Sequence, residues 1–270
     1  MKFSTISSHF WGRGALLLLP FLLLYTVSCS EEMDSGTRVI AHRGAWKTQN
    51  LPENSIAALN HAIELGCYGA EFDVHMTLDS VPVVNHDADF MGMEIERTNY
   101  ADLLSVSLPN GEKIPTLEAY LKEGLQQDKT RLILEIKKAP SGKERTLLLT
   151  EKAVALVKQL GGEDQVEYIT FDFDAGVLVS QLTPGSEVAY LNGDKTPSEA
   201  KKSGYTSIDY NIKVYRKHPE WIEEAHKENM TVNVWTVNTK EDMMDMIQKK
   251  VDFITTNEPE RLFNLLSAQK

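Results

Sequence analysis

The sequence predicts an α/β protein, a (β/α)8 TIM barrel with a small insertion after the second strand. From Arg38 onward, short β-rich apolar runs alternate with longer segments of helical period, and eight such units follow one another. Eight strand and helix pairs over about 230 residues match the size of a barrel of roughly 250 residues. A doubly wound open sheet is the alternative. The chain has neither a Gly-rich dinucleotide fingerprint after its first strand nor a Walker-type phosphate loop, which favours the barrel.

The expected strands are short apolar runs bounded by turn residues. They begin near Val39, Ala70, Leu132, Val166, Glu187, Thr206, Thr231 and Phe253. The expected helices have apolar residues three and four positions apart and span 55–65, 116–126, 144–160, 220–228, 240–248 and 259–266. Segment 87–115 breaks the alternation with mixed charges and the turn-like Pro109-Asn110-Gly111. We interpret it as the insertion, beside the barrel mouth.

The first 28 residues have the layout of a secretory signal. Lys2 and Arg13 precede an apolar run at 15–27, which ends in small residues before Cys29. The run is shorter than the about 20 apolar residues of a transmembrane helix. Cleavage before Cys29 resembles the processing of bacterial lipoproteins, in which the new N-terminal cysteine is lipidated; ordinary secretion and a retained anchor are the alternatives. We therefore expect a signal peptide at 1–28, a short exposed linker at 29–37 and the barrel domain at 38–267.

The leader predicts an exported protein, either periplasmic or anchored to the outer membrane through Cys29. The acidic start Ser30-Glu31-Glu32 resembles the export signal of surface lipoproteins in some Gram-negative bacteria, so exposure at the cell surface is a further expectation. With Cys29 lipidated, only Cys67 remains, and no internal disulfide is expected. The formal net charge of −11 argues against duplex nucleic acid as a partner, because binding phosphates requires a basic surface. The oligomeric state is not readable from the sequence.

Polar residues gather where the first two strands end, which is where a barrel places catalytic groups. The first strand ends in His42 and Arg43. The second carries Glu71 and Asp73, which are two residues apart and therefore project from the same face. Two buried carboxylates repel one another and need a cation, a shared proton or solvent. A hard divalent cation with oxygen ligands meets that need; an outward-facing acidic strand edge is the alternative.

The third strand repeats this pattern with Glu135 and Lys137. Glu135 can supply a third oxygen ligand, while Lys137 either faces a phosphate held by the metal or forms an internal ion pair with Glu135. A short extended run after the second strand ends in His86, which Asp87 can orient. Two imidazoles near a metal provide an acid and a base for phosphoryl transfer, since their ordinary pKa lies near 6.5.

These segments together resemble the glycerophosphodiester phosphodiesterase family. The order and spacing rest on His42-Arg43-Gly44, Pro52-Glu53-Asn54-Ser55, Glu71-Phe72-Asp73-Val74, and Pro82-Val83-Val84 with His86-Asp87. Later segments agree, namely Leu134-Glu135-Ile136-Lys137, Thr170-Phe171-Asp172, Val234-Trp235-Thr236-Val237-Asn238 and Ile254-Thr255-Thr256-Asn257-Glu258-Pro259. The resemblance covers the whole chain after the leader.

The resemblance implies a TIM barrel in which three carboxylates hold one divalent cation, either Mg²⁺ or Ca²⁺, with Mn²⁺ as a further candidate. The implied metal ligands are Glu71, Asp73 and Glu135. The implied acid and base are His42 and His86, and which is which stays open. The implied phosphate ligands are Arg43 and Lys137, with Asn54 supporting the site. Phe171 and Trp235 would offer apolar surface to the glycerol part of the substrate, and a core role for either aromatic is the alternative.

The implied reaction is metal-dependent hydrolysis of a small glycerophosphodiester to glycerol 3-phosphate and an alcohol. The alternatives are a phosphodiesterase acting on lysophospholipids or phospholipids, and a non-catalytic barrel that binds head groups. The chain has Arg97-Thr98-Asn99 where the family commonly has Arg-Thr-Thr-x-Gly, which leaves the head-group preference open. His75 shares the strand face of Glu71 and Asp73 and is a further candidate ligand.

Overall fold

Eight parallel strands close into a barrel in the computed structural model, which describes residues 36–268. Each strand pairs with its neighbours, and the first pairs with both the last and the second, which closes the sheet. The barrel strands are β1 (Arg38–Ala41), β2 (Gly69–Met76), β6 (Arg131–Ile136), β7 (Val166–Thr170), β8 (Val188–Tyr190), β9 (Ser207–Asn211), β10 (Thr231–Trp235) and β11 (Phe253–Thr256). The predicted TIM barrel is confirmed. The predicted signal peptide at 1–28 and the lipidation site Cys29 lie outside the described residues.

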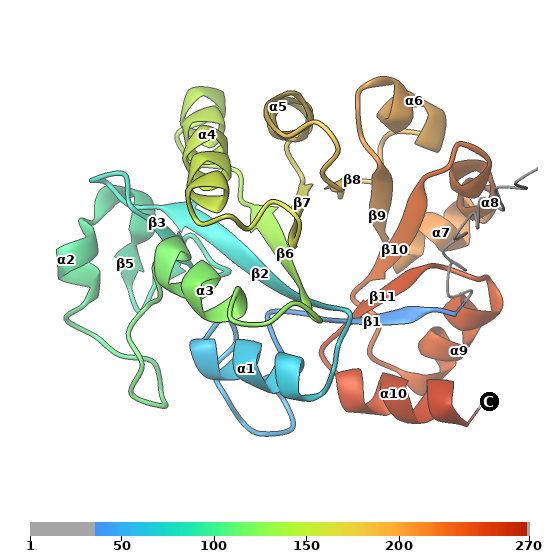
Figure 1. Cartoon of the computed structure of the whole chain (residues 1–270), viewed down its shortest axis with the longest axis horizontal. Coiled ribbons are helices and arrows are strands. Elements are labelled where there is room, and N and C mark those ends of the chain that lie inside the picture. The colour runs from blue at the N-terminus through green and yellow to red at the C-terminus, as the bar shows by residue number, and fades with distance from the viewer. Residues whose placement is uncertain (1–35, 269–270) are drawn as a thin grey trace, which may run out of the picture. The chain divides into compact units, whose positions relative to one another are not determined.

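Helices surround the barrel (Figure 1). They are α1 (Ile56–Glu64), α3 (Leu117–Gly124), α4 (Lys143–Gln159), α5 (Phe173–Leu182), α6 (Pro197–Lys202), α7 (Ile212–Lys217), α8 (Glu220–Lys227), α9 (Lys240–Gln248) and α10 (Pro259–Ser267). Several begin at a side chain that accepts a backbone N–H of the first turn, as Ser55, Thr116 and Thr239 do. Six of the nine coincide with the predicted helical segments, whereas α5, α6 and α7 were not among them.

The alternation of side chains along each strand divides the apolar residues into two layers. Outward side chains such as Ile208 and Tyr210 of β9 pack under the helices in the main core. Inward side chains such as Ile40, Ile133 and Ile169 form a smaller cluster inside the barrel. The carboxylates predicted to bind metal alternate with apolar residues on the same strands, so they lie inside the barrel as well.

The insertion after β2 has a small apolar core of its own. It contains β3 (Pro82–Val84), which pairs antiparallel with β2, then β4 (Asp89–Phe90), β5 (Met93–Glu94), η1 (Ile95–Arg97) and α2 (Tyr100–Leu103). Its core consists of Val83, Phe90, Ile95, Leu103 and Ile114. Figure 1 shows these elements beside β3, at the left of the barrel. The predicted insertion is therefore a compact lobe on the edge formed by β2 and β3.

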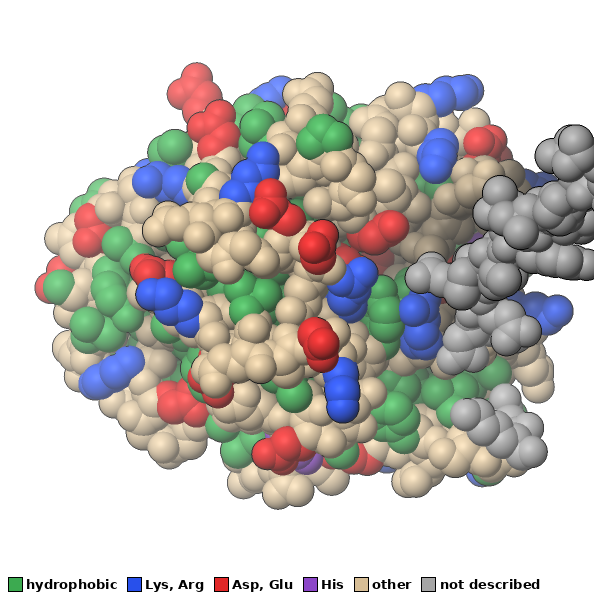
Figure 2. Space-filling view, in the orientation of Figure 1, with side chains coloured by type: hydrophobic (Ala, Val, Ile, Leu, Met, Phe, Trp, Pro, Cys, Tyr) green, Lys and Arg blue, Asp and Glu red, His purple; other side chains and the backbone are tan. Residues whose placement is uncertain are grey.

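The surface shown in Figure 2 mixes acidic and basic side chains and gathers neither sign into one large patch. Among residues 36–268, no helix combines the length and the apolar character that crossing a bilayer requires.

Candidate active site

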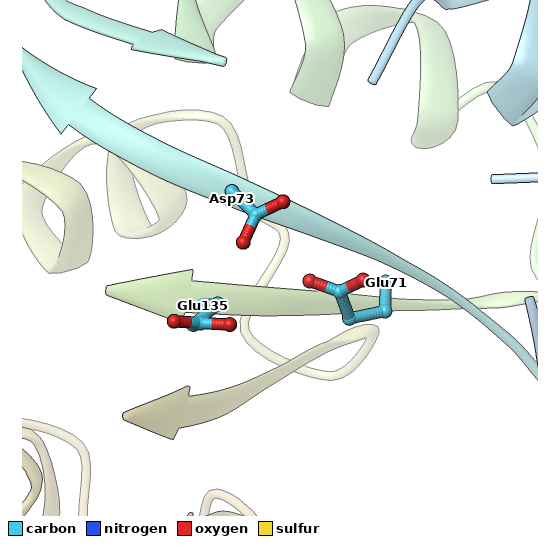
Figure 3. A group of neighbouring side chains, drawn as sticks. All are labelled: Glu71, Asp73 and Glu135. Atoms are coloured by element: carbon cyan, nitrogen blue, oxygen red, sulfur yellow. The ribbon is translucent and has the colours of Figure 1, made fainter. Parts of the chain in front are cut away.

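Three buried carboxylates converge inside the barrel. Glu71 and Asp73 project from β2, and Glu135 projects from β6, where it is the register partner of Asp73. Each offers an oxygen, and these oxygens all lie within 4.8 Å of one another. Figure 3 shows the three carboxyl groups turned toward the space between the two strands. The sequence-based expectation that these residues share one face holds, and the register of β2 with β6 brings the third carboxylate to the first two.

The electrostatics of this acidic triad show that it needs a counter-charge. Burial, together with the charges of Asp73 and Glu135, holds the pKa of Glu71 well above its usual range. Burial and the charge of Asp73 raise the pKa of Glu135 to about 7. Burial also opposes ionisation of Asp73, but the Lys137 ammonium, the two imidazoles and the Asn54 hydrogen bond together outweigh it, and the pKa of Asp73 is lowered. Within residues 36–268, the buried Glu71 Oε1 has no hydrogen-bond partner. An all-carboxylate donor set of this kind fits a hard divalent cation.

The two cationic residues predicted to bind phosphate border the triad. Lys137 Nζ lies 2.9 Å from Glu135 Oε1 and 3.2 Å from Asp73 Oδ1, and these carboxylates raise its pKa although burial opposes the charge. The Arg43 Nη1 donates to both carboxylate oxygens of Glu53 at 2.9 Å, while Arg43 Nε lies 3.8 Å from Asp73 Oδ2. The internal ion pair of Lys137 with Glu135 therefore exists, and both cations line the same cavity as Glu71 and Glu135.

The two predicted catalytic imidazoles lie on the walls of that cavity. His42 Nε2 is 3.9 Å from Glu71 Oε2, and its Nδ1 is 2.6 Å from Asn257 Oδ1. Burial, with the nearby Arg43 charge, lowers the pKa of His42 to about 4. His86 is more exposed, and its Nδ1 lies 2.7 Å from Asp87 Oδ1, the contact expected from the sequence.

The cavity contains about 470 Å³ of empty space, including its open mouth. One side carries the imidazoles, cations and carboxylates. The other is mainly apolar, with Ile169, Phe171, Leu191 and Trp235. The rings of Phe171 and Trp235 meet edge to face with centroids 5.4 Å apart. Both aromatics predicted to contact the substrate therefore line the cavity rather than the core under the helices.

Residues 42–261 match the model of the glycerophosphoryl diester phosphodiesterase family. The chain belongs to this family. A glycerophosphodiester phosphodiesterase of Caldanaerobacter subterraneus subsp. tengcongensis is 33% identical over 248 residues, which are 85% of this chain and 98% of that protein. The crystal structure of a glycerophosphodiester phosphodiesterase from Parabacteroides distasonis has a TM-score of 0.85 at 44% identity, covering 87% of this chain and 98% of that one.

A phosphodiesterase of Oleispira antarctica, solved in complex with the product sn-glycerol-3-phosphate, shares the fold with a TM-score of 0.74 at 21% identity, over 86% of this chain and 97% of that one. The family and the predicted enzyme class, a phosphoric diester hydrolase, are thus confirmed. The family depends on divalent metals, and the buried triad of this phosphodiesterase can hold one. The roles given to individual residues stay predictions.

The backbone of the phosphodiesterase is held in unusual conformations around its triad. Arg43 and Asn54 have positive φ of 59° and 60°, a region that costs free energy in residues other than glycine. In these positions the Arg43 N–H donates to Glu71 Oε2 at 2.8 Å, and the Asn54 side chain bonds to both Oδ2 and the N–H of Asp73. Asn54 thus contacts a triad carboxylate directly, and its role in substrate binding stays a prediction. Gly44 has φ of 78°, and a Cβ there would lie 2.7 Å from the backbone of Ala58.

Several residues that hold the site of the phosphodiesterase together were not predicted from the sequence. Two of them lie in the motifs that carry the family resemblance, but no role was predicted for them. Asn257 contacts His42, and Glu53 binds Arg43. His75 was a candidate ligand, yet its Nε2 lies 3.0 Å from the backbone oxygen of His86, and it is not among the triad oxygens. It supports the backbone of His86 instead. Asp209, also in the cavity lining, could have been found from its alternation with Ile208 and Tyr210.

Proposed function

We propose that this enzyme hydrolyses glycerophosphodiesters to glycerol 3-phosphate and an alcohol, with one divalent cation, Mg²⁺ or Ca²⁺, held by Glu71, Asp73 and Glu135. The observation that carries the proposal is a buried acidic triad beside two imidazoles in one cavity. The product bound by the structurally similar Oleispira antarctica enzyme, sn-glycerol-3-phosphate, supports this choice of substrate.

The bound cation would neutralise charge on the phosphodiester. Lys137, whose ammonium lies against Asp73 and Glu135, would then share those carboxylates with the cation and turn toward the phosphate. Arg43 would hold a second phosphate oxygen, because Glu53 fixes its Nη1 and the buried Nε, 3.8 Å from Asp73 Oδ2, has no hydrogen-bond partner in the described part of the chain. Two cationic side chains on one wall give the phosphate a defined orientation.

His42 is the proposed base and His86 the proposed acid. The side-chain Oδ1 of Asn257 accepts a hydrogen bond from the Nδ1–H of His42, which leaves the lone pair on Nε2. The low pKa of His42 keeps that nitrogen free of a proton near neutrality. Its lone pair takes the proton of the attacking glycerol hydroxyl, which forms a cyclic phosphate that water then opens. His86 gives its proton to the departing alcohol oxygen, and the Asp87 carboxylate, 2.7 Å from Nδ1, orients the ring.

The experiment that tests this function is a metal-reconstituted activity profile. The purified enzyme is stripped with a chelator and assayed with Mg²⁺, Ca²⁺ or Mn²⁺ on glycerophosphodiesters that differ in head group, and on the matching lysophospholipids and phospholipids. We expect turnover of the deacylated substrates only when a cation is added. Full activity in the chelated sample would refute the metal role, and preference for an acylated substrate would favour the lipid-cleaving alternative. Binding without turnover in every cation would identify a non-catalytic barrel.

We also propose that the chain is exported and anchored by a lipid at Cys29, in the periplasm or on the outer membrane. The support is the basic and apolar layout of residues 1–28 before that cysteine. Cell fractionation of the wild type and Cys29→Ser tests the anchor. The wild type should be extracted from the membrane only by detergent, whereas the variant should be released in soluble form; equal partitioning would contradict lipidation.

A further inference from the structure

Asp209 is a buried carboxyl group for which the proposed reaction has no use. It lies in the middle of β9, faces the barrel interior, and is 2% exposed. Its neighbours Ile208 and Tyr210 face the core under the helices. Carboxyl groups are seldom buried without a partner, because the lost hydration must be replaced. Within residues 36–268, however, the Oδ1 atom of Asp209 has no hydrogen-bond partner.

Asp209 belongs to the lining of the active-site cavity, together with His42, Glu71 and Trp235. The Trp235 indole Nε1 donates to the backbone oxygen of Asp209 at 2.9 Å, which ties the aromatic wall to β9. Burial raises the pKa of Asp209 to about 8, although the Asn233 side chain lowers it by hydrogen bonding. A neutral carboxyl group can both donate and accept a hydrogen bond, as a hydroxyl ligand requires.

A second cavity, at the opposite end of the barrel interior, also borders Asp209. Several polar side chains there are paired with one another. Ser207 Oγ donates to the backbone oxygen of Thr231 at 2.9 Å, and Thr231 Oγ1 donates to Ser207 Oγ at 2.8 Å. Glu167 accepts from the Tyr68 hydroxyl at 2.5 Å and pairs with Arg131 at 3.2 Å. Tyr168 also lines this cavity, and its hydroxyl has no hydrogen-bond partner among the described residues, but its side chain belongs to the core under the helices. The polar side chains named above therefore leave no group at this end that needs a ligand.

The glycerol part of the substrate brings polar groups that the active-site cavity must satisfy. Its hydroxyl next to the phosphate ester is the proposed attacking group, which leaves the terminal hydroxyl. The cavity wall away from the cations is mainly apolar, with Ile169, Phe171 and Leu191, and Asp209 is the carboxyl group in the lining that lies outside the triad. A hydroxyl that enters such a cavity loses its hydration and needs a partner.

We propose that Asp209 binds the terminal hydroxyl of the glycerol moiety and thereby selects glycerol phosphodiesters over those of diols that lack this hydroxyl. The inference rests on the function proposed above. Asp209 is then a specificity residue, and the unpartnered Oδ1 is the atom that receives the substrate. A site built to hydrogen-bond a hydroxyl discriminates against the analogue without it, because the polar group of the protein is left unpaired.

The test compares two ligands that differ only in this hydroxyl, sn-glycerol 3-phosphate and the matching enantiomer of 2-hydroxypropyl phosphate. Their dissociation constants are measured by calorimetry with the metal-loaded enzyme, so the result does not require turnover. The proteins are the wild type, Asp209→Leu, Asp209→Asn and the control Ser207→Ala. Ser207 faces the barrel interior from the same strand but lines only the opposite cavity.

We expect the wild type and Ser207→Ala to prefer glycerol 3-phosphate by about 10- to 100-fold. In Asp209→Leu this preference should fall to about threefold or less, and Asp209→Asn, which keeps a donor and an acceptor, should retain most of it. An unchanged preference in Asp209→Leu, or no preference in the wild type, would overturn the proposal. If Asp209→Leu fails to fold, full preference in Asp209→Ala would overturn it equally. Failure of the proposed reaction would appear separately, as tight product binding without hydrolysis of any glycerophosphodiester.

Discussion

Glu71→Gln is the substitution that separates a metal site from a merely structural acidic cluster. Glutamine keeps the size of the side chain and a carbonyl oxygen that can accept the Arg43 N–H, which Glu71 Oε2 accepts at 2.8 Å. It removes one negative charge and one carboxylate ligand. The substitution therefore has opposite consequences for the stability of the metal-free protein and for its response to a cation.

For the metal-free protein, the expected change in the free energy of unfolding on Glu71→Gln follows from the raised pKa of Glu71. Two ionised carboxylates 4.8 Å apart repel by about 3.5 kcal/mol at an effective dielectric constant of 20. The folded protein avoids this by keeping Glu71 protonated, whereas the unfolded chain ionises it above its ordinary pKa of 4.5. Stability is thus lost as the pH rises above 4.5, by about 1.4 kcal/mol per pH unit until the folded pKa is reached. At pH 7 the neutral glutamine should recover up to about 3 kcal/mol, or about 6–12 °C in Tm.

A bound cation should stabilise the wild type more than Glu71→Gln. At a concentration 100 times its Kd, a cation that binds only the folded state stabilises the wild type by about 2.7 kcal/mol. Glu71→Gln should lose most of that gain. Thermal unfolding followed by circular dichroism, in chelator and in excess Mg²⁺, Ca²⁺ or Mn²⁺, measures both effects. Glu167→Gln is a matched control, because Glu167 is a largely buried glutamate with a raised pKa at the other end of the barrel; its response to the cation should equal that of the wild type.

Two results would refute this reasoning. A wild-type Tm that no cation raises would mean that the triad does not bind metal. A Glu71→Gln protein less stable than the wild type in chelator would mean that the negative charge of Glu71 is compensated within the fold.

Three further predictions concern the turn after β1, the imidazoles and the proton content of the triad. Gly44→Ala should lower the free energy of unfolding by about 2–4 kcal/mol, because alanine is strained at φ of 78° and its Cβ would lie 2.7 Å from the Ala58 backbone. A denaturation midpoint equal to that of the wild type would contradict this prediction. His42→Ala and His86→Ala should each reduce kcat at least about 100-fold with an unchanged melting curve, and near-normal rates in either would exclude that residue as acid or base. Cation affinity should rise between pH 6 and pH 8, since Glu135, with a pKa of about 7, must lose its proton to bind the cation. Calorimetry in buffers of different ionisation enthalpy should detect the released proton. A pH-independent affinity would argue against this model.

The sequence could predict the barrel because local rules decide it. Eight expected strand starts agree with the observed ones to within one residue, since buried parallel strands are short, apolar and bounded by turn residues. The helices that escaped prediction, α5, α6 and α7, include two of only six residues, too short for a helical period to stand out. The period of two along β2 was enough to place Glu71 and Asp73 on one face, and the structure shows that this face is the inward one.

Distances across the barrel could not be predicted in the same way, because they depend on strand order and register. Asn257 reaches His42 although 215 positions separate them, since β11 is the parallel neighbour of β1. His75 has the same inward alternation as Glu71, yet it bonds to the backbone of His86 because the antiparallel β3 brings that segment alongside the end of β2.

The sequence by itself therefore determined the fold class, the enzyme family and the kinds of side chain in the site, because these depend on residue identity and on the local spacing of apolar residues. Only the tertiary structure decided which of those groups meet. The register of β2 with β6 placed three carboxylates within 4.8 Å of one another, and Asp209 Oδ1 has no hydrogen-bond partner within residues 36–268, because burial and pairing are set by neighbours that are distant in the chain.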